Sequence, residues 1–198
     1  MERLICLAVG YLCGCFLTAE VVARRTTGES ARHLGTGNPG MSNMIGVLGK
    51  GPGLLVLLGD LLKTALACFL CAGVLFPQLG RLAILYAGLG AVLGHNFPAW
   101  AGFQGGKGVA VTCAALVFSF PLWGLISCLL GLAAALLTGY LPVGAIVIPL
   151  VALLPAYRLG GGEALMLVGL LALLMLSRHI HGLAGALRGT EPKKFRPE

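Results

Sequence analysis

Seven apolar runs, separated by short polar segments, are the feature that most restricts how this chain can fold. A helix needs about 20 mostly apolar residues to cross roughly 30 Å of hydrocarbon. The runs lie near residues 4–23, 53–76, 80–97, 107–121, 122–139, 141–157 and 163–180. They lack the short alternating segments that mark barrel strands. We therefore expect an all-α integral membrane protein with about seven transmembrane helices.

Composition supports a single polytopic membrane domain over residues 1–198. Charged residues make up 11% of the chain, whereas a soluble domain carries about 25%. The first run is expected to be retained as a helix, because no small-residue cleavage site followed by polar sequence ends it. Five or six spans are the alternative if residues 107–139 form one bent helix or a re-entrant pair.

The basic residues predict the orientation of the chain in the membrane. With seven spans, the larger group, on one side, is Arg24, Arg25, Arg32, Lys50, Lys107, Arg178, Arg188, Lys193, Lys194 and Arg196. The other side has only Arg3, Arg81 and Arg158. Cytoplasmic loops carry the excess of basic residues, so we expect the N-terminus outside and the C-terminus in the cytoplasm. Loops 24–52 and 98–106 and the tail 181–198 then face the cytoplasm. The net charge of +7 indicates contact with anionic membrane lipids and not with nucleic acid.

One stretch, GHNFPAWAGFQGGKG at residues 94–108, carries polar residues and glycines between apolar runs. Unpaired polar groups are too costly for a helix surface that faces lipid. Gly105, Gly106 and Gly108 leave room for a ligand to approach backbone N–H groups beside Lys107. A helix that begins at Lys107 would add the positive end of its dipole. These features predict an anion site, and phosphate is the anion that they favour.

Another glycine-rich stretch, earlier in the chain at residues 35–43, is expected on the same face of the membrane. Its glycines permit tight turns, and its hydroxyl and amide side chains supply donors for a backbone nest that binds anions. The residues that we expect at the site are Thr36, Gly37, Asn38, Gly40, Ser42 and Asn43. For Asn43 the alternative is that it caps a short helix. Two such loops on one face favour a functional interpretation over simple turns.

Two ionisable residues, Asp60 and Lys63, lie three positions apart on one face of the second span. Charges at membrane depth are costly and usually face a partner or a cavity. Two interpretations follow: a structural ion pair, or a lysine that reaches the anion pocket. Glu20, near the end of the first span, is expected to pair with Arg24 one turn later.

Two glycine pairs have the spacing of close helix contacts. Gly10 and Gly14 lie in the first span, and Gly90 and Gly94 lie in the third. Small residues four apart let helix backbones approach each other in membranes. We therefore expect these glycines to serve packing and not chemistry.

No metal site is expected. The seven cysteines lie in apolar runs, and the C-x-x-C of Cys68 and Cys71 has no companion histidine or second pair, so we interpret them as small buried residues. His179 and His181 are two positions apart and do not share a helix face.

Three motifs and one residue pair follow one another along the chain. The motifs are GTGNPGMSN at residues 35–43, GHNFPAWAGFQGGKGVAV at 94–111, and a segment that begins at His179 and ends in Gly189-Thr190-Glu191; the pair is Asp60-x-x-Lys63. Together they resemble the bacterial acyl-phosphate:glycerol-3-phosphate acyltransferase family (PlsY). The resemblance implies an inner-membrane enzyme with seven helices, a cytoplasmic site and no cofactor. It implies that acyl phosphate and glycerol 3-phosphate react to give lysophosphatidic acid, acylated on the 1-hydroxyl, and inorganic phosphate.

The resemblance and the chemistry of the side chains suggest roles for individual residues. The catalytic candidates are Thr36, Asn38, His95, Lys107 and His179. The substrate-binding candidates are Gly37, Gly40, Ser42, Asn43, Lys63, Asn96, Gly105, Gly106, Gly108 and Glu191. An acyl phosphate is already activated, so catalysis needs positioning and charge stabilisation and no Ser-His-Asp set. The proton of the acceptor hydroxyl goes to His95, to His179 or to the substrate phosphate, and His95 is alternatively a structural donor.

Four positions depart from the family pattern. Thr36 replaces a serine and keeps the hydroxyl, Gly46 and Ile180 each replace an arginine, and Gly182 replaces an asparagine. The residues that could compensate are Lys50, Arg178, His181 and Arg188. These losses leave a second interpretation, in which the chain is a catalytically altered paralogue that binds or transports a membrane organophosphate or lipid.

Overall fold

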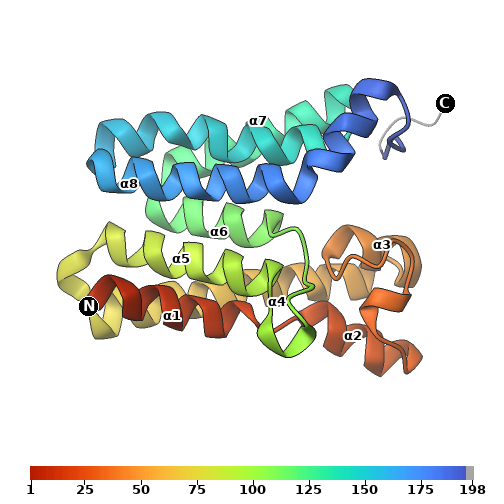
Figure 1. Cartoon of the computed structure of the whole chain (residues 1–198), viewed down its shortest axis with the longest axis horizontal. Helices are drawn as coiled ribbons and strands as arrows, with labels where there is room; N and C mark the ends of the chain where they lie inside the picture. The colour runs from red at the N-terminus through yellow and green to blue at the C-terminus, as the bar shows by residue number, and fades with distance from the viewer. Residues whose placement is uncertain (195–198) are drawn as a thin grey trace. The chain divides into compact units, whose positions relative to one another are not determined.

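The computed structural model describes residues 1–194, and every regular element in that range is a helix (Figure 1). Five helical segments are long and apolar enough to cross a membrane: Glu2–Thr27, Lys50–Leu75, Arg81–Ala101, Pro121–Thr138 and Leu141–Arg188. The all-α class is thus confirmed, whereas the count of seven spans stays a prediction. Arg196, which we counted with the cytoplasmic basic residues, lies outside the described residues.

The chain divides into two compact units, Met1–Ala115 and Leu116–Glu198, which we describe separately. The helices are α1 (Glu2–Gly14), α2 (Thr18–Thr27), α3 (Met41–Leu48), α4 (Lys50–Phe69), α5 (Arg81–Asn96), α6 (Val109–Ser119), α7 (Pro121–Thr138) and α8 (Leu141–Arg188). A π-helical turn at Leu70–Leu75 continues α4, and single 3-10 turns occur at Ala31–His33, Pro77–Leu79 and Ala99–Ala101. The short helix α3 is the one helix that no apolar run had predicted.

The first predicted span consists of two helices, which corrects the expectation of one continuous helix over residues 4–23. Helix α1 ends at Gly14, and α2 begins at Thr18. Between them Leu17 has an extended backbone, with φ −95° and ψ 98°. No proline causes this break, so its origin lies in the residues that pack against it.

Two donors from distant parts of the first unit stabilise the break. The indole Nε1 of Trp100 donates to the carbonyl oxygen of Cys15 at 2.7 Å. The ammonium of Lys63 donates to the carbonyl oxygen of Phe16 at 2.8 Å. Helix interruptions persist where other groups satisfy the freed backbone carbonyls. The break therefore depends on contacts that are far apart in the sequence.

Helices α1 and α5 approach each other through the two predicted glycine pairs. Gly10 and Gly14 line α1, and Gly90 and Gly94 line α5. A Cβ atom built on any of the four would overlap a backbone carbonyl oxygen of the other helix. The prediction that these glycines serve close helix packing is confirmed.

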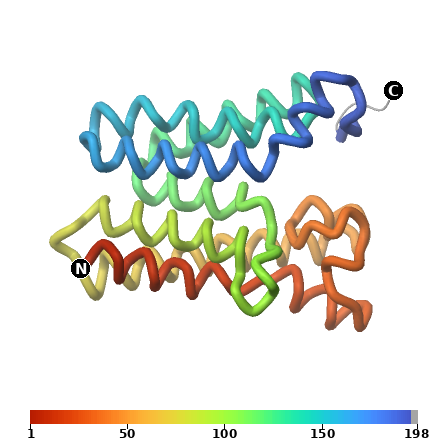
Figure 2. The backbone as a smooth tube through the Cα atoms, viewed as in Figure 1, coloured from red at the N-terminus to blue at the C-terminus, as the bar shows by residue number. Residues whose placement is uncertain are grey.

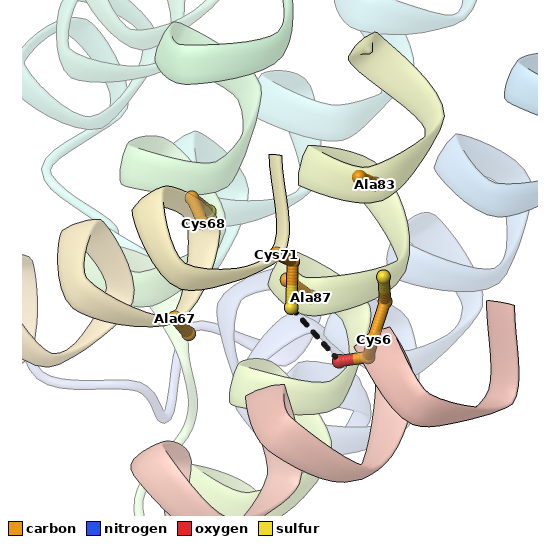
Figure 3. Close-up of a cluster of buried hydrophobic side chains, with 6 residues drawn as sticks. All are labelled: Cys6, Ala67, Cys68, Cys71, Ala83 and Ala87. Carbon is orange, nitrogen blue, oxygen red and sulfur yellow. Dashed lines mark hydrogen bonds between the residues drawn. The ribbon is translucent and has the colours of Figure 1, made fainter. Parts of the chain in front are cut away.

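Three of the cysteines belong to a buried cluster formed by α1, α5 and the end of α4 (Figure 3). Cys6, Cys68 and Cys71 are at most 5% exposed. The thiol of Cys71 donates to the carbonyl oxygen of Cys6, with Sγ at 3.8 Å. The alanines around them are Ala67, Ala83 and Ala87. This packing is that of small apolar residues, as the sequence indicated.

In the second unit, α7 packs against α8. The backbone of α8 leaves helical geometry at Gly161 (φ 75°, ψ −174°), and the chain reverses direction there (Figures 1 and 2). The two arms of α8 correspond to the predicted spans 141–157 and 163–180. Beyond α8, the backbone N–H of Lys194 donates to the carbonyl oxygen of Gly139 at 3.0 Å, which attaches the described part of the tail to the α7–α8 turn.

Candidate active site

The second glycine-rich loop, residues 97–108, folds back onto the end of α5. The N–H of Gly105 donates to the carbonyl oxygen of Asn96, and the N–H of Gly106 donates to that of His95, each at 3.0 Å. A Cβ on Gly105 would overlap the His95 carbonyl oxygen, and a Cβ on Gly106 would overlap Nε2 of the His95 ring. Both N–H groups are thus used inside the protein, and these glycines shape the loop.

Helix α6 begins at Val109, so the prediction of a helix start at Lys107 was two residues too early. Gly108 has a φ of +78°, a conformation that favours glycine. Its carbonyl oxygen accepts the N–H of Thr112 at 2.9 Å, which closes the first turn. Lys107 is half-buried and directly precedes this turn, where the helix dipole favours an anion. In the described part of the chain the N–H groups of Lys107 and Gly108 make no backbone hydrogen bond.

Asn96, the last residue of α5, lies fully buried next to Gly108. A Cβ on Gly108 would be 2.6 Å from Oδ1 of Asn96. Among residues 1–194, neither Oδ1 nor Nδ2 of Asn96 has a hydrogen-bond partner. Buried polar groups are normally paired, with protein, water or ligand. The Asn96 amide therefore has capacity for a polar partner at the start of α6.

Lys63, Asp60 and His95 form a buried cluster between α4 and α5. Nζ of Lys63 lies 2.7 Å from Oδ1 of Asp60 and 2.9 Å from Nδ1 of His95. All three residues are at most 6% exposed. The predicted Asp60–Lys63 pair is confirmed, and its partners inside the protein favour the structural interpretation over a lysine that reaches an anion. The contact with His95 was not predicted, because it depends on how α4 packs on α5.

Glu20 binds residues near the start of the first glycine-rich loop, residues 28–40. Its Oε1 accepts from Nε of Arg24 at 2.6 Å, which confirms the predicted pair. Its Oε2 accepts from the hydroxyl of Ser30 at 2.9 Å and from the N–H of Ala31 at 3.0 Å. A buried carboxylate with three donors ties the loop to α2. The sequence indicated only the first of these three bonds.

Asn43 holds the middle of the same loop from inside α3. Its Oδ1 accepts the N–H of Thr36, and its Nδ2 donates to the carbonyl oxygen of Leu34, both at 2.9 Å. The residue that caps α3 is Gly40, so the alternative of a capping Asn43 is wrong. The geometry supports a loop-shaping role for Asn43; its contact with substrate stays a prediction.

The remaining candidates in and next to the first loop differ in exposure. Thr36 and Ser42 are exposed, and Asn38 is half-buried. The N–H of Gly37 donates to the carbonyl oxygen of Leu34, and that of Gly40 to the carbonyl oxygen of Asn38, each at 2.9 Å. The hydroxyls of Thr36 and Ser42 are therefore accessible to a ligand from water.

Arg32 connects the two glycine-rich loops within the first unit. Its guanidinium Nη2 donates to the carbonyl oxygen of Gln104. No pattern in the sequence identified this bond, since its partners are far apart and one of them is a backbone group. It joins the first loop to the second loop; that Thr36, Asn38 and Lys107 share one anion site stays a prediction.

His179 and Glu191 belong to the second unit. His179 is 4% exposed, and its Nδ1 lies 3.0 Å from the carbonyl oxygen of Met175. Because a carbonyl only accepts, Nδ1 carries a proton, and a neutral ring then has its lone pair on Nε2. Glu191 is half-buried and follows the end of α8, where its N–H donates to the carbonyl oxygen of Gly185 at 3.2 Å.

The departures from the family pattern differ in their surroundings. Gly46 is exposed on α3, and a Cβ there would have no atom within 4 Å. Gly182 is crowded, since a Cβ would lie 2.7 Å from Cγ of Pro142 and 3.3 Å from Oε1 of Glu191. An arginine at position 46 would thus fit, whereas an asparagine at position 182 would require Pro142 to shift.

Comparison with known proteins extends over almost the whole chain. Residues 4–189 match the family model described as glycerol-3-phosphate acyltransferase. Glycerol-3-phosphate acyltransferase of Agrobacterium fabrum is 35% identical over 93% of this chain and 88% of its own length. Glycerol-3-phosphate acyltransferase 1 of Lactobacillus acidophilus is 47% identical over 60% of this chain, and the match spans little more than half, 56%, of that relative.

A solved structure agrees with the fold. It is the crystal structure of PlsY (YgiH), an integral membrane glycerol 3-phosphate acyltransferase, in the glycerol 3-phosphate form. The two chains superimpose with a TM-score of 0.85 at 29% identity, covering 98% of this chain and 96% of the other. With the apolar helices described above, this similarity shows a multi-pass integral membrane protein.

Proposed function

Because this chain belongs to the glycerol-3-phosphate acyltransferase family, we propose that it transfers the acyl group of an acyl phosphate to the 1-hydroxyl of glycerol 3-phosphate. The products are lysophosphatidic acid, a precursor of phospholipids, and inorganic phosphate. The observation that carries the proposal is the junction of two glycine-rich loops through Arg32 and Gln104, in a chain whose residues 4–189 match the family model.

The reaction balances without a further reactant. The hydroxyl oxygen of the acceptor attacks the acyl carbon, and the bond from that carbon to the phosphate oxygen breaks. Phosphate leaves with the electron pair of this bond. The proton of the hydroxyl passes to the departing phosphate; His179, which belongs to the second unit, is a candidate acceptor only through the resemblance. The acyl group is already activated, so the enzyme contributes mainly position and charge stabilisation.

Lys107 is the residue that we assign to a phosphate group. Its side chain precedes the first turn of α6, where the N–H groups of Lys107 and Gly108 and the helix dipole favour an anion. The accessible hydroxyls of Thr36 and Ser42 and the amide of Asn38 add hydrogen-bond donors from the first loop. Glu191 is assigned to substrate binding only through the resemblance.

The placement in the membrane follows from the charge pattern and the helices. We assign seven crossings, with the N-terminus outside and the C-terminus in the cytoplasm of a bacterium. The two arms of α8 around Gly161 support two separate crossings, and α6 supplies a short one. The glycine-rich loops then meet water on the cytoplasmic side, where a charged substrate such as glycerol 3-phosphate dissolves. The apolar donor reaches the same site from the cytoplasmic membrane.

A second function, binding or transport of an organophosphate or lipid without turnover, draws its support from the lost polar positions, of which Gly46 and Gly182 are two. Gly46 lacks the arginine of the family, and Gly182 stands where an asparagine does not fit without a shift of Pro142. Both functions need the anion site at Lys107, so they differ in turnover and not in binding.

A product assay tests the proposed function. The purified protein in detergent receives palmitoyl phosphate and glycerol 3-phosphate, and phosphate release and lysophosphatidate are followed. We expect product that requires both substrates and that is lost in Lys107→Met. The matched control is Lys194→Met, which removes an exposed lysine of the second unit and should leave turnover unchanged. A folded protein without turnover that still binds glycerol 3-phosphate would support the binding function, and hydrolysis of the donor without the acceptor would indicate a different acceptor.

A further inference from the structure

Lys63 lies where three segments of the first unit meet: the break between α1 and α2, helix α4 and the end of α5. Its ammonium is 2.8 Å from the Phe16 carbonyl oxygen, 2.7 Å from Oδ1 of Asp60 and 2.9 Å from Nδ1 of His95. An ammonium group has three N–H donors and no acceptor. Two of these donors make hydrogen bonds, to the Phe16 carbonyl oxygen and to Nδ1 of His95. The carboxylate of Asp60 lies at ion-pair distance and supplies the charge that a buried lysine needs.

This arrangement determines which nitrogen of His95 carries a proton. Because Lys63 only donates, Nδ1 of His95 accepts, and a neutral imidazole then has its proton on Nε2. A doubly protonated ring would instead direct an N–H at the Lys63 ammonium, with both charges buried. His95 therefore has no lone pair on Nε2, which is the reverse of the arrangement at His179, where Nδ1 faces a carbonyl.

Nε2 of His95 is directed at the second loop. A Cβ on Gly106 would overlap this nitrogen. His95 itself is only 3% exposed. The backbone of His95 also accepts the Gly106 N–H at 3.0 Å. Ring and carbonyl together thus lie against Gly106, the residue that immediately precedes Lys107, so we expect the orientation of the ring to influence the position of Lys107.

We propose that Asp60 and Lys63 are positioning residues that hold His95 as its Nε2-protonated tautomer, and that His95 supports the loop before Lys107 instead of accepting the proton of the substrate. The role of Lys107 in this statement rests on the proposed function. The tautomer of His95 does not, and it can be measured without substrate.

The first test is the ¹⁵N NMR spectrum of the histidine-labelled protein in detergent. The chain has four histidines, and the signal that disappears in His95→Gln belongs to His95. We expect a neutral ring with its proton on Nε2. In Asp60→Leu/Lys63→Met, which removes both charges together and so leaves no unpaired one, we expect a mixture of tautomers. A wild-type ring protonated on Nδ1, or a double variant with an unchanged spectrum, would overturn the proposal.

The second test compares two substitutions of His95 in the product assay. Glutamine can place an N–H near the position of Nε2 but cannot act as a base, and leucine provides neither. If His95 is a supporting donor, we expect His95→Gln to stay within about tenfold of wild-type turnover and His95→Leu to show a raised KM for glycerol 3-phosphate. If His95 is a general base, both variants should lose about 10²–10⁴-fold in kcat. Equal and large losses would therefore contradict the proposal.

The two tests separate this inference from the proposed function. Suppose that the wild-type protein shows no acyl transfer, that its His95 carries the proton on Nε2, and that this preference is lost in Asp60→Leu/Lys63→Met. The proposed function then fails, and the positioning by Asp60 and Lys63 stands. If acyl transfer occurs and the tautomer is the other one, the inference fails and the proposed function stands.

Discussion

The two glycine-rich loops of the first unit reach their shapes by different means. The first loop is tied down by side chains, the carboxylate of Glu20 and the amide of Asn43, which bind its backbone. The second loop is tied down by its own backbone, with Gly105 and Gly106 packed so tightly on α5 that a Cβ would overlap its atoms. The first loop should therefore depend mainly on the two side chains that bind it, although a Cβ on Gly35 would also overlap Oδ1 of Asn43. The second loop should depend mainly on the absence of side chains at Gly105 and Gly106.

The largest effect is expected for Gly106→Ala in the second loop. The added methyl group overlaps the His95 ring, so the loop must move and displace Lys107. A displacement of about 1 Å costs roughly 10²-fold in rate, and we expect a loss of that size in kcat/KM for glycerol 3-phosphate. Gly51→Ala is the control, because a Cβ there meets nothing within 4 Å. Similar activity in the two variants would show that the second loop tolerates an added methyl group at Gly106.

The next largest effect is expected for stability, from changes in the buried Asp60–Lys63 pair that contacts His95. Asp60→Leu leaves the Lys63 ammonium buried without its counter-charge, and removal of one partner of a buried pair costs about 3–5 kcal/mol. We expect a large fall in the thermal unfolding midpoint in detergent. The double variant Asp60→Leu/Lys63→Met should recover most of it. If the single variant were as stable as the double one, the pair would not be buried as described.

A smaller effect is expected in the first loop for Asn43→Ala. The N–H of Thr36 and the carbonyl oxygen of Leu34 lose their partners, at a cost of about 1–3 kcal/mol where such groups stay buried. Asn43→Asp keeps the acceptor for Thr36 and should lose less. Unfolding midpoints and the KM for glycerol 3-phosphate measure both variants. An alanine variant more stable than the aspartate variant would show that Asn43 does not shape the loop.

The smallest effect on stability is expected for Gly46→Arg, which adds atoms next to the first loop. No atom lies within 4 Å of the position of a Cβ there, and such surface changes are usually within about 0.5 kcal/mol. The restored arginine should lower the KM for glycerol 3-phosphate, and less so at high salt. A large fall in the unfolding midpoint of Gly46→Arg would show that α3, next to the first loop, also rejects added atoms.

The sequence predicted the parts of the fold that depend on local chemistry. The apolar runs located the membrane helices, since the thickness of hydrocarbon dictates their length, and the spacing of Asp60 and Lys63 predicted an ion pair. The break before Thr18 was missed, because it is held by Trp100 and Lys63, which are distant in the sequence. Helix α3 was considered only as an alternative that began after Asn43, because it is too short to leave an apolar run of membrane length, and it begins at Met41.

The candidate site was predicted in its residue types but only partly in its geometry. The glycines before Lys107 suggested N–H groups directed at an anion, yet those of Gly105 and Gly106 bind α5. Sequence patterns show where a side chain is missing, but they do not show what fills the space. The bond from Arg32 to Gln104 ends on a backbone carbonyl, a type of partner that residue identity does not reveal.

The interlocked glycines of α1 and α5 have a consequence for how the second loop can move. The backbones of these two helices touch at four glycines, so sliding or rolling would bring carbonyl groups into collision, and we expect α1 and α5 to move together. His95 and Asn96 end α5 and keep residues 105–108 in place. We therefore expect motion of the loop to be confined to its outer segment, residues 102–104, which is exposed and contains Phe103 in a left-handed conformation with φ 58°.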